Sequence, residues 1–230
     1  MTTRRTGLRE QKKQATREAL SAAALRLALE RGPDNVRVDD IAEAAGVSPR
    51  TYNNYFSSRE QAIVAAVTSE REVRIAAAVA GRPAGVGLAV AVVEAVVDQF
   101  TAPGEAGRDA LLLITTSPAL CGAFVDSAGA IEGPLVEAIA GRLGDPDPDA
   151  GPDVGPDVGP DAGPHTARVL AASVAAAVRV ALEQWLRAAA ASFTAGGLVV
   201  PSGSLPELLR AALAPLVPAL DAAERRARRS

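Results

Sequence analysis

The chain has 230 residues, of which 48% are hydrophobic, 22% are charged and only 3% are aromatic, and its formal net charge is −3. These values are typical of a soluble globular protein with one or two domains. The single cysteine, Cys121, and the single histidine, His165, exclude a disulfide framework and a Cys/His zinc site, and no cofactor is expected. A core with so few rings must consist mainly of Ala, Val and Leu, which suits closely packed helices.

No segment is expected to cross a membrane, because a spanning helix needs about 20 mainly apolar residues. The longest uncharged stretch, residues 188–206, contains three glycines and two prolines and cannot form one continuous helix. The basic N-terminus is not followed by the apolar run that a secretory signal needs. We therefore expect a cytoplasmic protein.

Charge is unevenly distributed along the chain. Residues 1–60 contain 11 basic and 8 acidic side chains, whereas residues 61–230 contain 13 basic and 19 acidic ones. Six of the basic side chains fall within the first 17 residues, where Glu10 is the only acid. Residues 1–15 are therefore expected to form a basic arm that attracts polyanions. The other interpretation of this arm is a solvated, disordered tail.

Apolar residues at helical spacing predict a first helix over residues 16–30 and a short second helix over residues 38–45. After a three-residue turn at residues 46–48, a third helix is expected over residues 49–56, with Ser48 as its N-cap. No stretch alternates like a strand, so the predicted fold class is all-α. Further helices are expected over residues 58–79, 85–101, 106–115, 118–142, 165–195 and 204–228.

Two short helices joined by a three-residue turn and preceded by a packing helix match a helix-turn-helix unit. In the third helix, Tyr52 and Phe56 are four residues apart and are expected to face a core that contains Leu20, Leu27 and Ile41. The opposite face lacks an acid and carries side chains that can bond bases or phosphates. These residues are Arg50, Thr51, Asn53, Asn54 and Tyr55. A solvated helix surface is the alternative, but the coincidence of turn, caps and basic arm favours DNA binding.

Residues 17–63 resemble the N-terminal domain of TetR-family transcriptional regulators. The resemblance covers about a fifth of the chain and rests on an Ile-Ala-x-x-Ala-Gly-Val-Ser block at residues 41–48 and a Thr-x-x-x-Tyr-Phe block at residues 51–56. It implies a homodimeric, all-helical regulator whose third helix enters the major groove of double-stranded DNA. The residues that match the family's contact positions are Ser48, Arg50, Thr51, Asn53, Asn54 and Tyr55, and Arg59 matches the Lys that holds a phosphate.

Two positions depart from the family's pattern. Asn53 stands where Tyr is common, which replaces an aromatic contact by an amide suited to bidentate contact with adenine. Arg37 stands where Thr commonly caps the second helix. Because Arg is a poor cap but a good phosphate ligand, we add Arg37 to the expected DNA contacts.

The sequence divides into a helix-turn-helix domain at residues 16–62 and a domain for ligand binding and dimerisation at residues 63–230. Recurring Pro, Gly and Asp predict a disordered or extended spacer at residues 144–164. The few large side chains of the second domain are either plain core or the wall of a mainly aliphatic ligand site. They are Phe100, Phe124, Trp185 and Phe193.

The last two helices are expected to pair with their copies in a four-helix interface, and Pro215 and Pro218 should interrupt the second of them. The apolar residues expected in these helices are Val169, Leu170, Val174, Val178, Leu182, Trp185, Leu208, Leu209, Leu213, Leu216, Val217 and Leu220.

These patterns predict a transcriptional regulator, in particular a repressor that leaves a palindromic operator when a small, largely apolar effector binds. One alternative is a dimeric DNA-binding regulator without a ligand. Another is an enzyme with an incidental helical N-terminal domain, but with one His, one Cys and scattered carboxylates no catalytic group of residues has a suitable spacing.

Overall fold

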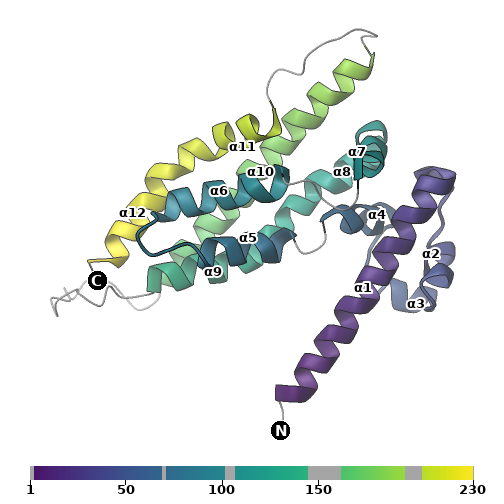
Figure 1. Ribbon diagram of the computed structural model, residues 1–230, viewed down its shortest axis with the longest axis horizontal. Coiled ribbons are helices and arrows are strands. Elements are labelled where there is room, and N and C mark those ends of the chain that lie inside the picture. Colours follow the sequence, from purple (N-terminus) through teal and green to yellow (C-terminus); the bar gives the residue numbers. More distant parts are fainter. Residues whose placement is uncertain (1–2, 69–70, 102–106, 145–161, 195–203, 230) are drawn as a thin grey trace. The chain divides into compact units, whose positions relative to one another are not determined.

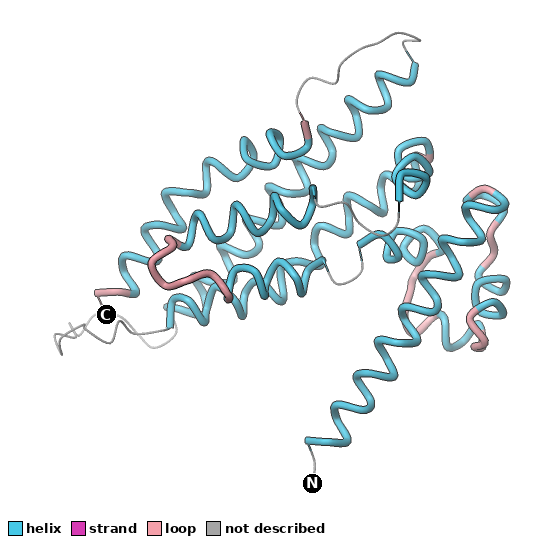
Figure 2. Tube along the Cα trace, viewed as in Figure 1, coloured by secondary structure: helices cyan, strands magenta, loops and turns pink. Residues whose placement is uncertain are grey.

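The computed structural model describes residues 3–68, 71–101, 107–144, 162–194 and 204–229 (Figure 1). Every regular element in these ranges is a helix, which confirms the all-α fold class (Figure 2). Of the expected spacer, residues 145–161 lie outside the described ranges.

The chain divides into two compact units. In unit 1 the N-terminal helices pack with two helices from the middle of the chain, so this unit is larger than the predicted domain at residues 16–62. Its elements are α1 (Thr3–Arg31), η1 (Pro33–Asn35), α2 (Val38–Ala44), α3 (Pro49–Tyr52), α4 (Arg59–Thr68), α7 (Gly107–Thr116) and α8 (Pro118–Asp126).

Unit 2 is a bundle of the remaining helices, in which α10 packs against α9 and α11, and α5 packs against α6 and α9. The short helix η2 (Ser127–Ile131) connects α8 with α9. The elements of the bundle are α5 (Arg71–Ala80), α6 (Leu88–Thr101), α9 (Glu132–Gly144), α10 (Ala162–Thr194), α11 (Leu205–Leu213), η3 (Ala214–Leu216) and α12 (Val217–Ala227).

Helix α1 begins at Thr3, whereas the apolar spacing predicted a start near residue 16. Residues 3–15 carry no apolar stripe, but most of them are Arg, Lys, Gln or Glu, which favour a helix even when they are fully solvated. The expected basic arm is therefore helical from Thr3 onwards.

Several long predicted helices are interrupted. The helix expected over residues 58–79 consists of α4 and α5, which belong to different units. The helix expected over residues 118–142 is broken because Pro134 has no N–H to donate and can lie only in the first turn of α9. The last helix is interrupted at η3, which contains Pro215, as the sequence predicted.

Two stretches of the described residues, Pro118–Gly144 and Pro164–Ala189, are long and apolar enough to cross a membrane. Length and composition alone do not distinguish such a stretch from the core helix of a soluble protein. The first stretch is not a single helix, and the second carries Arg179 and Glu183 as an ion pair on its exposed side.

In unit 2 a mostly buried ion pair ties the loop between α5 and α6 to α9 and α12. The guanidinium of Arg142 donates to the carbonyl oxygens of Arg82, at 2.9 Å, and of Val86. Glu224 lies 3.9 Å from Arg142 and accepts a hydrogen bond of 2.9 Å from the backbone N–H of Leu88. Glu224 therefore satisfies one of the free N–H groups at the start of α6 while it neutralises Arg142.

Removing the carboxylate of Glu224 should destabilise unit 2. We expect Glu224→Ala to lower the free energy of unfolding by about 3 kcal/mol, because it leaves the mostly buried Arg142 without its counter-charge and Leu88 without its acceptor. Urea unfolding followed by circular dichroism measures this loss. As a control, Glu94→Ala removes an exposed carboxylate that pairs with Arg210 at 3.4 Å and should cost less than about 1 kcal/mol. Equal losses in the two variants would contradict the role given to Glu224.

Candidate nucleic-acid interface

The turn between α2 and α3 is fixed by its backbone geometry. Gly46 adopts a φ of +69°, in the left-handed region that favours glycine. The side chain of Ser48 accepts a hydrogen bond of 3.1 Å from the backbone N–H of Thr51, and Pro49 occupies the first helical position. The predicted N-cap and turn are therefore present, and they set the direction in which α3 leaves α2.

Helix α3 ends at Tyr52, although the sequence predicted a helix up to Phe56. Residues 53–55 continue as hydrogen-bonded turns, in which the N–H of Tyr55 donates to the carbonyl of Tyr52 at 2.8 Å. We call residues 49–55 the recognition segment. A helix of four residues cannot hold its own conformation, so the recognition segment depends on packing against the rest of unit 1.

Two rings supply that packing. Tyr52 and Phe56 are both buried, and their centroids lie 5.8 Å apart. The guanidinium of Arg17, in α1, lies 4.9 Å from the centroid of the Phe56 ring. These rings join a core that includes Leu20 and Ile41, as the four-residue spacing predicted.

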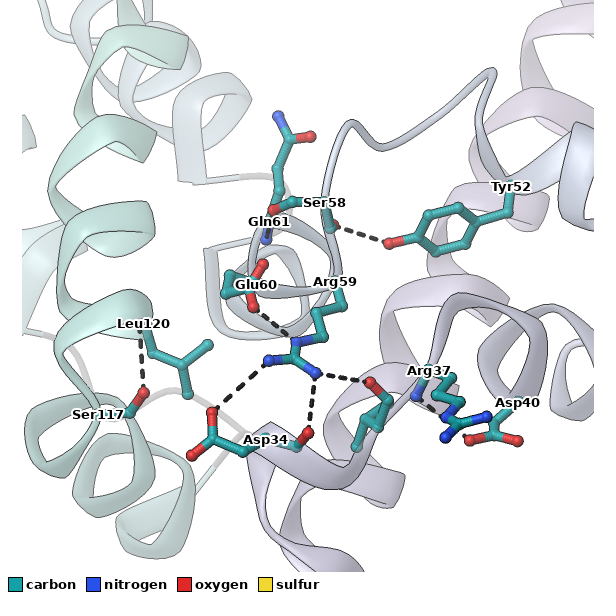
Figure 3. Close-up of polar contacts among 11 residues, drawn as sticks. Asp34, Arg37, Asp40, Tyr52, Ser58, Arg59, Glu60, Gln61, Ser117 and Leu120 are labelled. Atoms are coloured by element: carbon teal, nitrogen blue, oxygen red, sulfur yellow. Dashed lines mark hydrogen bonds and ion pairs between the residues drawn. The ribbon is translucent and has the colours of Figure 1, made fainter.

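The hydroxyl of Tyr52 donates a hydrogen bond of 2.7 Å to the carbonyl oxygen of Ser58, just before α4 (Figure 3). Burial, reinforced by the nearby negative charge of Glu60, raises the pKa of Tyr52 from 10.0 to about 12. Tyr52 is thus held neutral, with its proton directed at a backbone acceptor. The contact fixes the distance between the recognition segment and α4.

The opposite side of the recognition segment is open to solvent. Arg50, Asn53 and Asn54 are exposed, while Thr51 and Tyr55 are partly exposed. The exposed set offers a guanidinium and two amides, which can form bidentate hydrogen bonds with guanine and adenine respectively. The inward and outward sides of the segment are therefore those predicted from the sequence.

Arg37 and Ser48 lie at the N-termini of the two short helices. The backbone N–H of Arg37 donates to Asp40 at 3.2 Å, so the start of α2 is closed by Asp40 while the side chain of Arg37 is exposed. Ser48 is also exposed, and its hydroxyl lies 2.9 Å from that of Thr51. Arg37 thus presents a positive charge to solvent at the start of α2, as expected of a phosphate ligand.

Arg59 is arranged differently from Arg37, because its guanidinium points into unit 1 (Figure 3). Its Nε donates to Glu60 at 2.7 Å, and its Nη1 donates to the carbonyl oxygens of Asp34 and Val36 at 2.9 and 3.1 Å. Its Nη2 lies 3.6 Å from the carboxylate of Asp34. Arg59 therefore ties the start of α4 to η1. The sequence could not reveal this role, because two of the partners are backbone carbonyls 23 and 25 residues away.

The carboxylate of Glu60 completes this contact. Burial acts to raise the pKa of Glu60, but hydrogen bonds from Arg59, from its own backbone N–H and from Ser58 outweigh that effect and lower the pKa. Glu60 thus stays ionised and keeps its charge-assisted hydrogen bond with Arg59.

The candidate ligand-site residues are not gathered in one unit. Phe100 is buried in unit 2, Trp185 is partly exposed in the same unit, and Phe124 is buried in unit 1. The side chain of Phe193 lies outside the described residues. The sequence did not predict that the guanidinium of Arg71 lies 4.4 Å from the centroid of the Phe100 ring.

Arg71 is a partly buried charge that lies against the ring of Phe100. Burial lowers the pKa of Arg71 to about 10; the neighbouring Arg74 acts in the same direction and Glu72 opposes it. The guanidinium still carries its charge at neutral pH. Unit 2 therefore combines an aliphatic core with a positive charge next to one of its few rings.

A short helix, a three-residue turn and a solvent-facing recognition segment held by buried rings define a helix-turn-helix protein. Residues 20–66 match the family model described as bacterial regulatory proteins, tetR family. This part of the chain is therefore similar to the N-terminal domain of TetR-family regulators, in agreement with the sequence resemblance.

Two curated relatives and one solved structure are similar to this chain. The HTH-type transcriptional regulator TcmR of Streptomyces glaucescens is 32% identical over 147 residues, which is 60% of this chain and 65% of that protein. The HTH-type transcriptional regulator BetI of Rhizobium meliloti (strain 1021) is 43% identical over 53 residues, or 23% of this chain and 26% of that protein. A transcriptional regulator from Rhodococcus sp. Rha1 aligns over 89% of this chain and 97% of its own chain, with a TM-score of 0.37 and 19% identity.

The chain thus spans 65% and 26% of the lengths of the two curated relatives. Both relatives are named as transcriptional regulators rather than as enzymes.

The hydroxyl of Tyr52 can be tested by titration. In Tyr55→Phe, Tyr52 is the single tyrosine, and its ionisation, followed by near-ultraviolet absorbance, should occur near pH 12 rather than 10.0. Because the pKa is raised in the folded state, the stability that this shift contributes is complete below pH 10.0 and is lost as the pH rises through about 12. Tyr52→Phe serves as the control, since it should abolish the late ionisation. Ionisation of the native Tyr52 near pH 10.0 would contradict its burial and its hydrogen bond.

Proposed function

We propose that this protein is a cytoplasmic, homodimeric transcriptional repressor. It binds a palindromic operator in double-stranded DNA and leaves the operator when a small, largely apolar molecule binds unit 2. The observation that carries the proposal is the recognition segment, whose buried side is locked by Tyr52 and Phe56 and whose outer side exposes groups that bond bases. The match of residues 20–66 to the tetR family model, and the similarity to a relative named as a transcriptional regulator, support DNA as the partner.

Base contacts are assigned to Arg50 and Asn53, because both side chains are exposed and suit bidentate contacts with guanine and adenine. Asn54, Thr51, Tyr55 and Ser48 are assigned contacts with phosphates or base edges, and the exposed Arg37 is assigned a phosphate contact. Arg59 is assigned a positioning role, because its nitrogens already bond the carbonyls of residues 34 and 36 and the side chains of Asp34 and Glu60.

The proposed dimer uses the outward face of α10, which contains only Val169 of the residues that the sequence favoured. Of the twelve apolar residues expected in the interface, most face the core of unit 2, including Leu170, Val174, Leu182, Leu209 and Leu213. On the outward face of α10, Val169 and Val180 are exposed by 51% and 56%, and the exposed Ala176 lies between them on the same side of the helix. A second copy of α10 would bury these side chains.

The effector acts through a coupling free energy between unit 2 and the recognition segments of the dimer. It must bind better to the conformation in which the two recognition segments are wrongly spaced for successive major grooves. Couplings of this kind are typically about 1–3 kcal/mol. The alternative, a regulator without an effector, is distinguished by whether any small apolar compound both raises the melting temperature and releases bound DNA.

Substitutions in the recognition segment test the DNA contacts. A duplex selected by the full-length protein from a random-sequence pool provides the probe. Arg50→Ala and Asn53→Ala should each weaken binding by about 1–3 kcal/mol and relax the preference at one base pair, without changing the helical content. Arg26→Ala is the matched control, because it removes an exposed cation of α1 that lies outside the recognition segment. Unchanged affinity in both test variants would refute the assignment of the recognition segment.

A charge on the outward face of α10 tests the dimer. Val180→Glu should convert the protein to a monomer at micromolar concentration, since it places a carboxylate within the proposed apolar contact. Val90→Glu alters a side chain of nearly equal exposure on α6, 57% against 56%, and should leave the dimer intact. Sedimentation velocity distinguishes the two states. A wild-type monomer, or a Val180→Glu dimer, would show that the interface lies elsewhere or does not form.

A further inference from the structure

The first half of α1 carries a continuous line of basic side chains. Arg9, Lys12, Lys13 and Arg17 are all exposed, and their spacing of three, four and eight residues from Arg9 places them on one face of the helix. We call these four residues the basic stripe. Glu18 lies on the opposite face, where it accepts a hydrogen bond of 2.9 Å from Gln14. Among the residues from Arg9 to Glu18 whose side chains the structure describes, the cations therefore share one side of the helix.

The basic stripe is in phase with the buried face of the same helix. Leu20, Ala24 and Leu27 lie 11, 15 and 18 residues after Arg9, close to whole numbers of helical turns, and all three are buried. The side of α1 that packs into unit 1 thus continues, beyond the core, as a row of cations. Figure 1 shows the N-terminal half of α1 extending past α2 and α3.

One contact fixes the stripe next to the recognition segment. The guanidinium of Arg17, the last residue of the basic stripe, lies 4.9 Å from the centroid of the Phe56 ring. Phe56 follows the recognition segment directly and packs on Tyr52. The stripe therefore leaves the core of unit 1 on the side where the recognition segment is held.

We infer that the basic stripe is a rigid phosphate-binding extension, which lies along the DNA backbone beside the groove that the recognition segment enters. This inference rests on the proposed function. From Arg9 to Arg17 the helix rises about 12 Å, which is about the width of the major groove. The cations belong to the same continuous helix as the buried residues of α1. The direction in which each cation points is therefore set by the number of residues that separate it from those buried residues.

Charge removal is the first test. The variant Arg9→Ala/Lys12→Ala should reduce the slope of log affinity against log salt by about 2, since each phosphate contact contributes about 0.9. Binding should weaken on the order of 10- to 100-fold at about 0.1 M salt. Arg26→Ala/Arg31→Ala removes the same charge from the other end of α1 and should leave the slope unchanged. The probes are the selected duplex and an unselected duplex of equal length.

Helical phase is the second test. Two alanines inserted between Gln14 and Ala15 turn Arg9, Lys12 and Lys13 by about 200°, away from the DNA, and should reproduce the loss of slope. Four inserted alanines turn them by about 400°, which nearly restores their direction, and should recover most of the slope. A flexible arm would tolerate both insertions equally, and that result would overturn the inference.

The outcomes separate this inference from the proposed function. In one outcome, binding of the selected duplex depends on Arg50 and Asn53 while neither charge removal nor insertion alters the salt slope. That result would support the proposed regulator and exclude the basic stripe as a phosphate contact. If no duplex is selected but binding of the unselected duplex shows the predicted changes of slope, phosphate binding by the basic stripe is supported and sequence-specific recognition is refuted.

Discussion

Burial of the Tyr52 ring is the interaction on which the helix-turn-helix of unit 1 depends. Helix α3 has four residues, too few to be stable alone, and its outward side chains can act together only if its inward side is held. Tyr52 meets both needs, because its ring packs on Phe56 and its hydroxyl bonds the carbonyl of Ser58. Arg59 carries the connection further, from the start of α4 to η1. The rigidity of the recognition segment thus depends on contacts with residues outside it, namely Phe56, Ser58 and Arg59.

Much of this arrangement could be predicted from local sequence. The N-cap Ser48, the left-handed Gly46 and the four-residue spacing of Tyr52 and Phe56 are short-range features, and each depends on neighbours within one or two turns. The break at η3 is equally local, because a prolyl ring excludes the preceding helical hydrogen bond. Such features need no knowledge of the tertiary structure.

Other features could not be predicted for identifiable physical reasons. The early start of α1 was missed because a polar helix has no apolar stripe to detect. The inward direction of Leu170 and Val174 was missed because an apolar stripe shows that one side of a helix is covered, but not whether its own chain or a second copy covers it. Long-range partners, such as Arg59 with the carbonyl of Val36 or Arg71 with Phe100, leave no local pattern.

The pairing of α7 and α8 with the N-terminal helices has a consequence for how this protein can be divided. The chain passes between the two units three times, at residues 69–70, 102–103 and 127–128. Helix α8 packs against α4, and it contributes the buried Leu120 and Phe124 to unit 1. Unit 1 is therefore not a separable N-terminal domain. A chimera that contains this unit must also contain residues 107–126. Because α8 packs against α4, a change in the length of α7 or α8 would alter the packing of α4, which supports the recognition segment.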